Sequence, residues 1–224
     1  MRAYLSQNTD KGIIDALRQE GFVVKTLAPF SALAEPVSSH ADMLLFAVNG
    51  KIFKHKSYEI DDIENAINIE ERMGEKYPLD VPLNIALVGK NAFCNTQHAS
   101  RTVLDYLKSL KISVHHVSQG YAHCSTCIVG DNAIITADAS IANAAITVGI
   151  DTLKICEGHI SLPPYSYGFI GGASGVTESA VYFCGSIKYH PDGERIKEFC
   201  EAHGKKAVEL INAPLSDVGG ILFR

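Results

Sequence analysis

Four short polar clusters recur along the sequence, each just ahead of an apolar run. They are Ser39-His40-Ala41-Asp42, Ala122-His123-Cys124-Ser125, Gly172-Ala173-Ser174 and Ser216-Asp217. Imidazole, carboxylate and thiol groups are the usual agents of acid–base and nucleophilic chemistry. We predict that the clusters share one pocket, lined by His40, Asp42, His123, Ser125 and Asp217. The alternative interpretation is that they cap and stabilise turns, as Ser and Asp commonly do.

Cys124 and Cys127 form a C-x-x-C pair next to His123, with His115 and His116 shortly before it. Sulfur and imidazole are zinc ligands, so metal binding is one hypothesis, although no second ligand pair stands at a matching spacing. A redox pair would open a helix, whereas this one opens an apolar, strand-like run. Cys124 is also a candidate nucleophile, with His40 or His116 as a candidate base.

Residues 162–175, LPPYSYGFIGGASG, combine a Pro-Pro pair with tyrosines and glycines. This composition predicts a shaped lid or pocket wall, with Tyr165 and Ser174 as candidate ligand-binding residues. It matches neither nucleotide phosphate motif, and a strand follows where a helix should. A long connection that needs positive φ angles is the alternative.

The elements that must position these residues repeat. The run from Ser38 aligns without a gap with the run from Tyr121, matching His40 with His123 and Asn49 with Asn132. The sequence predicts strands over residues 2–6, 22–27, 83–88, 112–117, 152–156, 180–187, 206–211 and 220–223, and helices over 11–20, 61–73, 97–110, 140–148 and 193–203. Asn49-Gly50 predicts a hairpin, and residues 89–96 a loop. Recurrence of one βα unit predicts an α/β ring of repeats, with the last strand paired beside the first.

The 224 residues carry a net charge of −5 and are 46% hydrophobic. That composition fits a single globular domain over residues 1–224, and a division near residue 78 is the alternative. The absence of a basic run argues against nucleic-acid binding. No signal-like or membrane-spanning segment is evident, so we expect a cytoplasmic protein whose six cysteines are thiols. We expect a small-molecule ligand, no cofactor, no membrane partner and, by default, a homodimer.

Three stretches, GYAHCSTCIVGDNAIITAD, EGHISLPPYSYGFIGGASG and LSDVGGILF, resemble a bacterial domain family of unknown function with the guanidino-group-modifying (pentein) fold. The resemblance implies a five-bladed, pseudo-symmetric α/β propeller with a central site. In catalytic members of that fold a cysteine attacks a guanidinium carbon, a histidine moves protons and carboxylates hold the cation. His40 with Asp42, or His159, would supply the histidine. The nucleophile should follow the last Gly-Gly, where this chain has Ile221-Leu222-Phe223-Arg224.

Two classes of function follow. One is a pentein that binds a small polar or cationic compound without deiminase chemistry. The other is a hydrolase or transferase on a guanidino or amide compound, with Cys124, His40 or His123 as catalytic groups and Asp42 or Asp217 beside them. Metal binding through Cys124, Cys127 and histidines is a further alternative.

Overall fold

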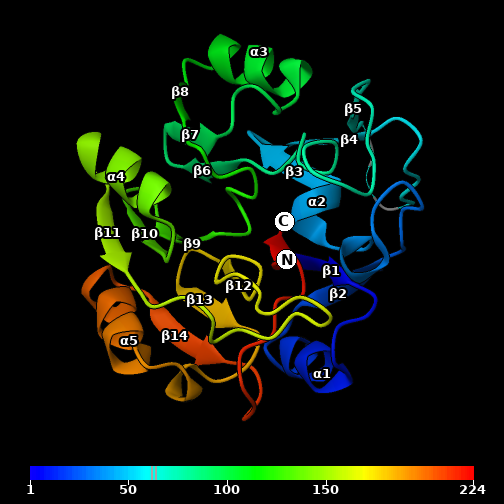
Figure 1. Cartoon of the computed structure of the whole chain (residues 1–224). Coiled ribbons are helices and arrows are strands. Elements are labelled where there is room, and N and C mark those ends of the chain that lie inside the picture. Colours follow the sequence, from blue (N-terminus) through cyan, green and yellow to red (C-terminus); the bar gives the residue numbers. More distant parts are fainter. Residues whose placement is uncertain (62, 64) are drawn as a thin grey trace.

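The computed structural model describes residues 1–224 apart from Asp62 and Glu64. In this part of the chain, five small sheets share one plan. Each has three strands: the first pairs antiparallel with the second, and the second pairs parallel with the third. Figure 1 shows the sheets set around a common centre. The predicted α/β fold of pseudo-symmetric repeats is therefore confirmed.

The strands and helices alternate in the manner of βα units. The strands are β1 (Arg2–Ser6), β2 (Val23–Leu27), β3 (Leu45–Val48), β4 (Lys51–His55), β5 (Ile67–Ile69), β6 (Ala86–Val88), β7 (Asn91–Cys94), β8 (Ser113–His116), β9 (Thr126–Gly130), β10 (Ala133–Thr136), β11 (Asp151–Lys154), β12 (Ser174–Val176), β13 (Ala180–Phe183), β14 (Lys206–Glu209) and β15 (Leu222–Phe223). The α-helices are α1 (Lys11–Gln19), α2 (Ala41–Leu44), α3 (Arg101–Ser109), α4 (Ala139–Thr147) and α5 (Gly193–Ala202). Two short 3₁₀ helices cover Glu35–Val37 and Ile187–Tyr189.

The sheets are ordered β15-β1-β2, β3-β4-β5, β6-β7-β8, β9-β10-β11 and β12-β13-β14. Four of them carry a helix between the second and third strands, and α1, α3, α4 and α5 form the periphery of the molecule (Figure 1). The first strands lie inside, where β6 contacts β9, β9 contacts β12 and β12 contacts β15. The loops that lead into these first strands therefore converge on the centre of the molecule.

Local chemistry explains the correctly predicted elements. Asn49 and Gly50 have φ angles of 48° and 72°, and Val48 pairs with Lys51 across them. This two-residue turn with two positive φ angles has the twist that a β-hairpin requires, so the hairpin prediction is confirmed. Side chains also cap the helices: Asp10 accepts from the Gly12 amide at the start of α1, and Ser100 from Val103 at the start of α3.

The prediction of a helix over residues 61–73 is wrong for the residues of that range that the structure describes. Asp62 and Glu64 lie outside the described residues. Asn65 has a positive φ of 59°, and β5 follows, paired parallel with β4. The apolar periodicity there is satisfied by long-range pairing that buries Ile69, which outweighs local helix propensity. Asn91, expected in a loop, instead begins β7, and Ser174 begins β12.

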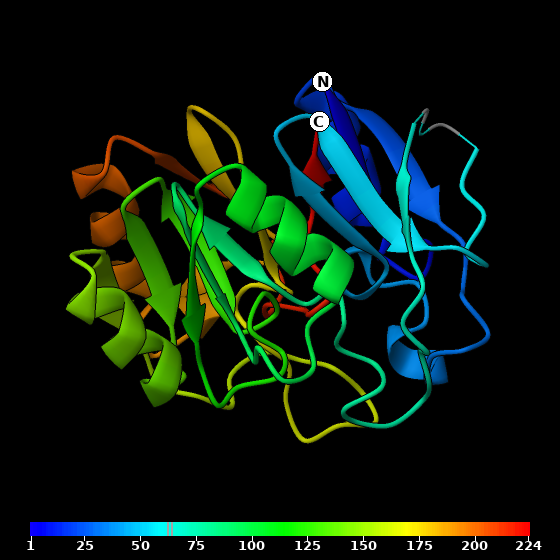
Figure 2. The same cartoon turned by 90° about the horizontal axis from the view of Figure 1, so that it is seen from above.

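The two ends of the chain meet in one sheet. β15 pairs antiparallel with β1, and the Arg224 amide donates to the Arg2 carbonyl at 2.8 Å. The predicted pairing of the last strand beside the first is thus confirmed. Figure 2 places both termini at one end of the molecule and the loop before β12 at the other. Every helix of the described residues falls short of the length and hydrophobicity that a bilayer span requires.

Candidate functional site

The segments that enter the five inner strands are joined by hydrogen bonds into a ring, which we call the central ring. Three of the five contacts join backbone to backbone, and the other two are made by the Asn84 side chain. The bonds run from the Asp42 amide to Gly219 O (3.0 Å), from Asn84 Nδ2 to Asp42 O (3.1 Å), from the His123 amide to Asn84 Oδ1 (2.8 Å), from the Gly172 amide to Cys124 O (3.0 Å) and from the Gly220 amide to Gly172 O (2.7 Å).

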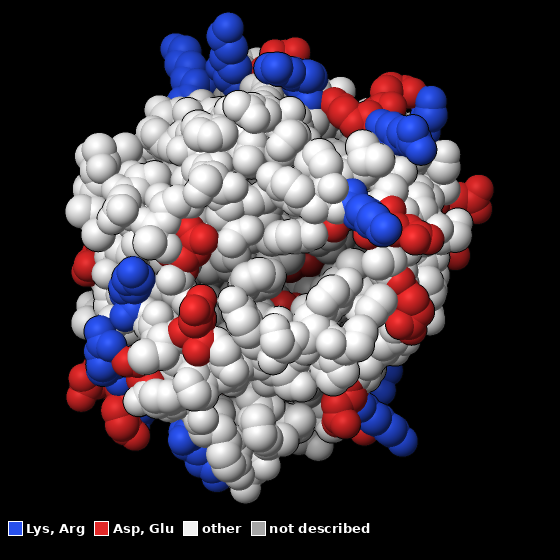
Figure 3. Space-filling view, viewed as in Figure 1, with Lys and Arg blue, Asp and Glu red and all other residues white. Residues whose placement is uncertain are grey.

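A cavity of about 360 Å³ lies at the loop end of this ring, and we call it the central cavity. Its polar lining comes from His40, Asp80, Cys124, Ser166 and Asp217, and its aromatic lining from Tyr121, Tyr165, Tyr167 and Phe169. Figure 3 looks into a hollow at the centre of this face, with acidic atoms at its bottom. Size, concavity and a few convergent polar groups are the usual features of a ligand site.

Asp217 is held rigidly at the wall of the central cavity. Its Oδ2 accepts from the Phe169 amide at 2.8 Å and its Oδ1 from the Gly219 amide at 3.0 Å. Burial raises the pKa of Asp217 to about 6, although these two amides act in the opposite direction. No Lys or Arg of the described chain lines the cavity. The carboxylate therefore carries no cationic partner from the cavity wall.

His40 lies beside Asp217, with Nδ1 3.8 Å from Oδ1. Burial lowers the pKa of His40 to about 4, so the imidazole is neutral near pH 7. Gly219 creates the space for it: with φ +79°, a Cβ there would lie 2.2 Å from His40 Cβ. A side chain at position 219 and the present placement of His40 are thus mutually exclusive.

Cys124 and Asp42 lie within the central ring. Asn84 Nδ2 is 2.9 Å from Cys124 Sγ, and the thiol interacts with the Asp42 carboxyl group. Burial, with Asp217 nearby, raises the pKa of Asp42 to about 7, and neither of its carboxylate oxygens has a hydrogen-bond partner among the described residues. Burial and the two carboxylates raise the pKa of Cys124 well above that of a free thiol. Without a bound cation, Cys124 is a neutral thiol.

The sequence-predicted residues divide among three cavities. His40, Cys124, Tyr165 and Asp217 line the central cavity. Asp42, His123 and Ser174 line a second cavity of about 240 Å³, within the inner strands on the other side of the ring. Ser125 lines a third, smaller one. The single shared pocket expected from the sequence is therefore divided, because the central ring separates its members.

Two residues of this region, Asp80 and Asn84, were not predicted as site residues from the sequence. Asp80 is 4% exposed, and its Oδ2 accepts a 2.7 Å hydrogen bond from the Tyr121 hydroxyl. Asn84 stands two residues ahead of β6, as Cys124 stands two ahead of β9. Its position in the repeat, equivalent to that of Cys124, was the sequence signal that could have identified Asn84 as a site residue.

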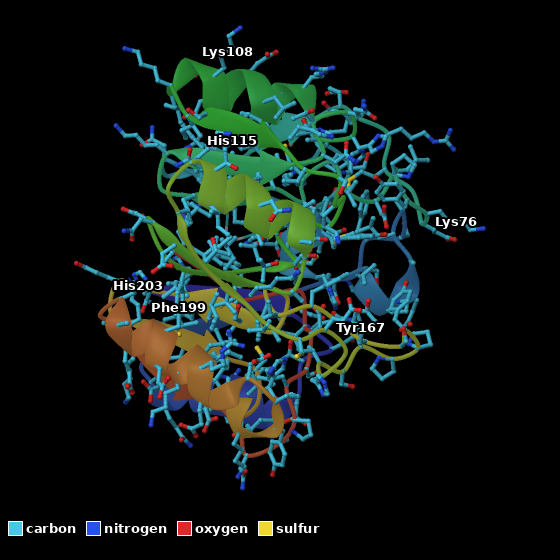
Figure 4. All side chains as sticks on the ribbon, turned by 60° about the vertical axis from the view of Figure 1, so that its left-hand side comes forward. Lys76, Lys108, His115, Tyr167, Phe199 and His203 are labelled. Carbon is cyan, nitrogen blue, oxygen red and sulfur yellow. The ribbon has the colours of Figure 1, made fainter. Side chains whose placement is uncertain are left out.

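The geometry does not support the metal hypothesis. Cys124 and Cys127 belong to different core clusters. His115 of β8 forms a hydrogen bond with Asn91 of β7, the neighbouring strand in the same sheet. Figure 4 shows His115 far from Tyr167, which lines the central cavity. Among the described residues, no group of three His, Cys, Asp or Glu side chains is arranged to hold a metal ion.

The profile of the DUF6873 family, described as a family of unknown function, matches residues 4–222. The chain belongs to this family. No curated protein matches the chain.

Solved structures with a similar fold are guanidino-modifying enzymes of the pentein fold. A DDAH variant from Pseudomonas aeruginosa, complexed with citrulline, aligns with a TM-score of 0.56 at 10% identity, over 98% of this chain and 95% of its own. A dimethylarginine dimethylaminohydrolase adduct aligns at 0.52 and 10% identity, over 93% and 91%. The agmatine deiminase of C. jejuni aligns at 0.51 and 11% identity, over 94% and 86%. At such identities these likenesses show the fold.

Proposed function

We propose that this protein binds a small organic cation with a guanidinium-like head group in the central cavity. The observation that carries the proposal is Asp217, a buried carboxylate fixed by two backbone amides in a cavity whose described lining has no Lys or Arg. A planar cation with several N–H donors offers such a carboxylate the charge-assisted hydrogen bonds that the protein leaves unmade. The neutral His40 beside it can accept a further N–H.

Two further features support a cationic ligand. Aromatic rings, including Tyr121 and Phe169, line the same cavity, and ring faces attract cations. Among the proteins of similar fold, the agmatine deiminase and the dimethylarginine dimethylaminohydrolase are named for guanidino compounds. At about a tenth sequence identity this is an analogy of fold, and the charge distribution of the cavity is the independent argument.

Calorimetry and thermal shift with butylguanidinium test the proposal, because a ligand that binds only the folded state raises the melting temperature. Asp217→Asn keeps the shape and removes the charge, so affinity should fall about 10–100-fold. Asp131→Asn, the same change at an exposed position, is the matched control and should leave affinity unchanged. Equal affinities of all three proteins, or no binding by wild type, would contradict the proposal.

A second candidate function is a hydrolase or transferase in which the Cys124 sulfur attacks the bound guanidinium or amide carbon. The new C–S bond replaces a C–N bond, whose nitrogen leaves as the amine with the thiol proton, and water (hydrolase) or an acceptor amine (transferase) then cleaves the C–S bond and restores the thiol. Cys124 lines the central cavity, and Asn84 donates to its sulfur, which favours the thiolate. The pKa of this thiol is raised by Asp42 and Asp217, so a bound cation that neutralises them would lower it.

Iodoacetamide labelling distinguishes the two candidates. The exposed Cys156 serves as the internal reference. For a catalytic protein, Cys124 should label faster with butylguanidinium bound than without it, and Cys124→Ser should abolish turnover. If the ligand instead protects Cys124 from labelling and no turnover is found, only the binding function is supported.

A further inference from the structure

The outer end of the central cavity contains a second buried carboxylate, Asp80. One oxygen accepts from the Tyr121 hydroxyl, and the other, Oδ1, is buried without a hydrogen-bond partner among the described residues. Burial raises the pKa of Asp80, as expected for a carboxylate that lacks a counter-ion. An orphaned buried acceptor of this kind is costly for the protein alone and is relieved by a ligand that donates to it.

Aromatic rings form a continuous chain that starts at Tyr121, the hydrogen-bond donor to this carboxylate. The Tyr121 ring lies nearly parallel to that of Phe169, with centroids 6.1 Å apart at 24°, and 6.0 Å from the ring of Tyr77. Tyr167 meets Phe169 edge-on at 6.3 Å. Tyr77 is 46% exposed, so the chain leads from solvent into the cavity. Ring faces attract alkylammonium groups, and a carboxylate beside them adds a charge-assisted hydrogen bond.

We propose that Asp80, Tyr121 and Phe169, with Tyr77 and Tyr167 at the rim, form a second cation subsite that takes the alkylammonium end of the ligand. This inference rests on the proposed function, which assigns the guanidinium end to Asp217. The ligand class is then an aminoalkylguanidine, a dication without a carboxylate.

The charges of the cavity argue against an amino-acid ligand. Its described lining contains Asp80 and Asp217 but no Lys or Arg, so an α-carboxylate would meet only like charge. Lys76, close to Asp80 in sequence, is exposed and projects outward in Figure 4. It is not part of the lining.

Calorimetry with three kinds of probe tests the subsite: alkylguanidines, aminoalkylguanidines of increasing chain length, and arginine. For the best-matched length, the terminal ammonium should tighten binding about tenfold over the alkylguanidine of the same length. Arginine should bind more weakly than that aminoalkylguanidine. Asp80→Asn should remove the gain by weakening the binding of the aminoalkylguanidine more than that of the alkylguanidine, and Asp131→Asn should leave both affinities unchanged.

The outcomes separate this inference from the proposed function. If the alkylguanidine binds in an Asp217-dependent way but no aminoalkylguanidine binds more tightly, the second subsite is refuted and the proposed function stands. Equal weakening of both probe types by Asp80→Asn also refutes it, because the loss is then not specific to the ammonium. If no probe binds, the proposed function itself fails.

Discussion

The central ring separates two cavities that differ in their walls. The central cavity, about 360 Å³, is walled largely by loops and presents two carboxylates, a thiol and tyrosines. The second, about 240 Å³, is walled largely by the inner strands and presents aliphatic side chains such as Leu45, Ile128 and Val176 beside Asp42 and His123. The difference lies in the backbone elements that form each wall.

Strands in a small ring must pack against one another, so most of their inward positions carry apolar side chains. The loops carry no such restriction and can hold charged groups by local amide donors, as the Phe169 and Gly219 amides hold Asp217. Because the central ring separates them, the apolar strand positions and the charged loop positions can lie within a few residues of each other along the chain. Substitutions in the central ring, in the loops of the central cavity and in the strands of the second cavity should therefore have effects of different size and on different properties.

The largest effect is expected for Gly219→Ala, which disrupts the ring itself. The new Cβ would clash with His40, and the positive φ adds strain, so unfolding should become easier by about 3 kcal/mol and cation binding should be lost. Gly149→Ala is the matched control: its φ is +80°, but nothing lies within 4 Å of the added Cβ. Strain alone should cost about 1 kcal/mol there. Equal losses in urea unfolding would mean that the ring contact is unimportant.

The pH dependence of binding is the next largest effect and belongs to the loop end. The pKa of Asp217 is about 6, and only its ionised form attracts a cation. At pH 5 about a tenth of the molecules are competent, so butylguanidinium should bind about tenfold more weakly than at pH 8. Asp217→Asn should flatten this profile. A wild-type affinity that does not change between these pH values would disprove the assignment.

Asp42 links the two cavities and should make stability depend on pH. Its pKa is about 7 in the folded protein and about 3.9 when unfolded, so the folded state holds the extra proton and loses stability as pH rises through 7. His40 and His123, with pKa values of about 4, act with the opposite sign until the unfolded chain has lost its histidine protons, above about pH 7.5. From pH 6.5 to 8 Asp42 alone should lower the free energy of unfolding by roughly 1 kcal/mol, a fall that the two histidines offset in the wild type.

Urea unfolding across this range measures the effect as a difference between variants. Asp42→Asn cannot ionise, so its free energy of unfolding should rise by roughly 1 kcal/mol from pH 6.5 to 8, whereas that of Asp131→Asn should stay nearly constant as in the wild type. The same pH dependence in both variants would show that Asp42 does not contribute.

The smallest effect is expected at the strand end. Val176→Thr introduces a hydroxyl into the second cavity, which the ring separates from Asp217. Affinity for butylguanidinium should not change, although some stability is lost with the methyl group of this half-buried side chain. Weaker binding by this variant, measured by calorimetry, would show that the ring does not isolate the two ends.

The sequence predicted the parts of the fold that local chemistry decides. The Asn49-Gly50 hairpin follows from turn geometry, and the repeat of strand, helix and strand follows from periodicity. The predicted helix over residues 61–73 failed because β5 is defined by its partner β4, and pairing between strands has no local signal as strong as a turn.

The candidate site was predicted in part, for a related reason. Of the five residues predicted to share a pocket, His40 and Asp217 line the central cavity together, because repeats around a centre bring the loops ahead of their strands together. Which side of the ring each side chain faces depends on single-residue offsets, and this moved His123 and Ser125 elsewhere. Asp80 was missed because it lies outside the repeated clusters.

The pairing of β15 with β1 makes the arrangement of repeats independent of the place where the chain is cut. Arg2 and Arg224 exchange backbone hydrogen bonds, so a short peptide could join them without moving either strand. New ends opened at the exposed Asn49-Gly50 turn would leave all five sheets with their present partners. A circular permutant of this kind should retain the central cavity, since its residues are brought together by their positions around the axis and not by their order along the chain.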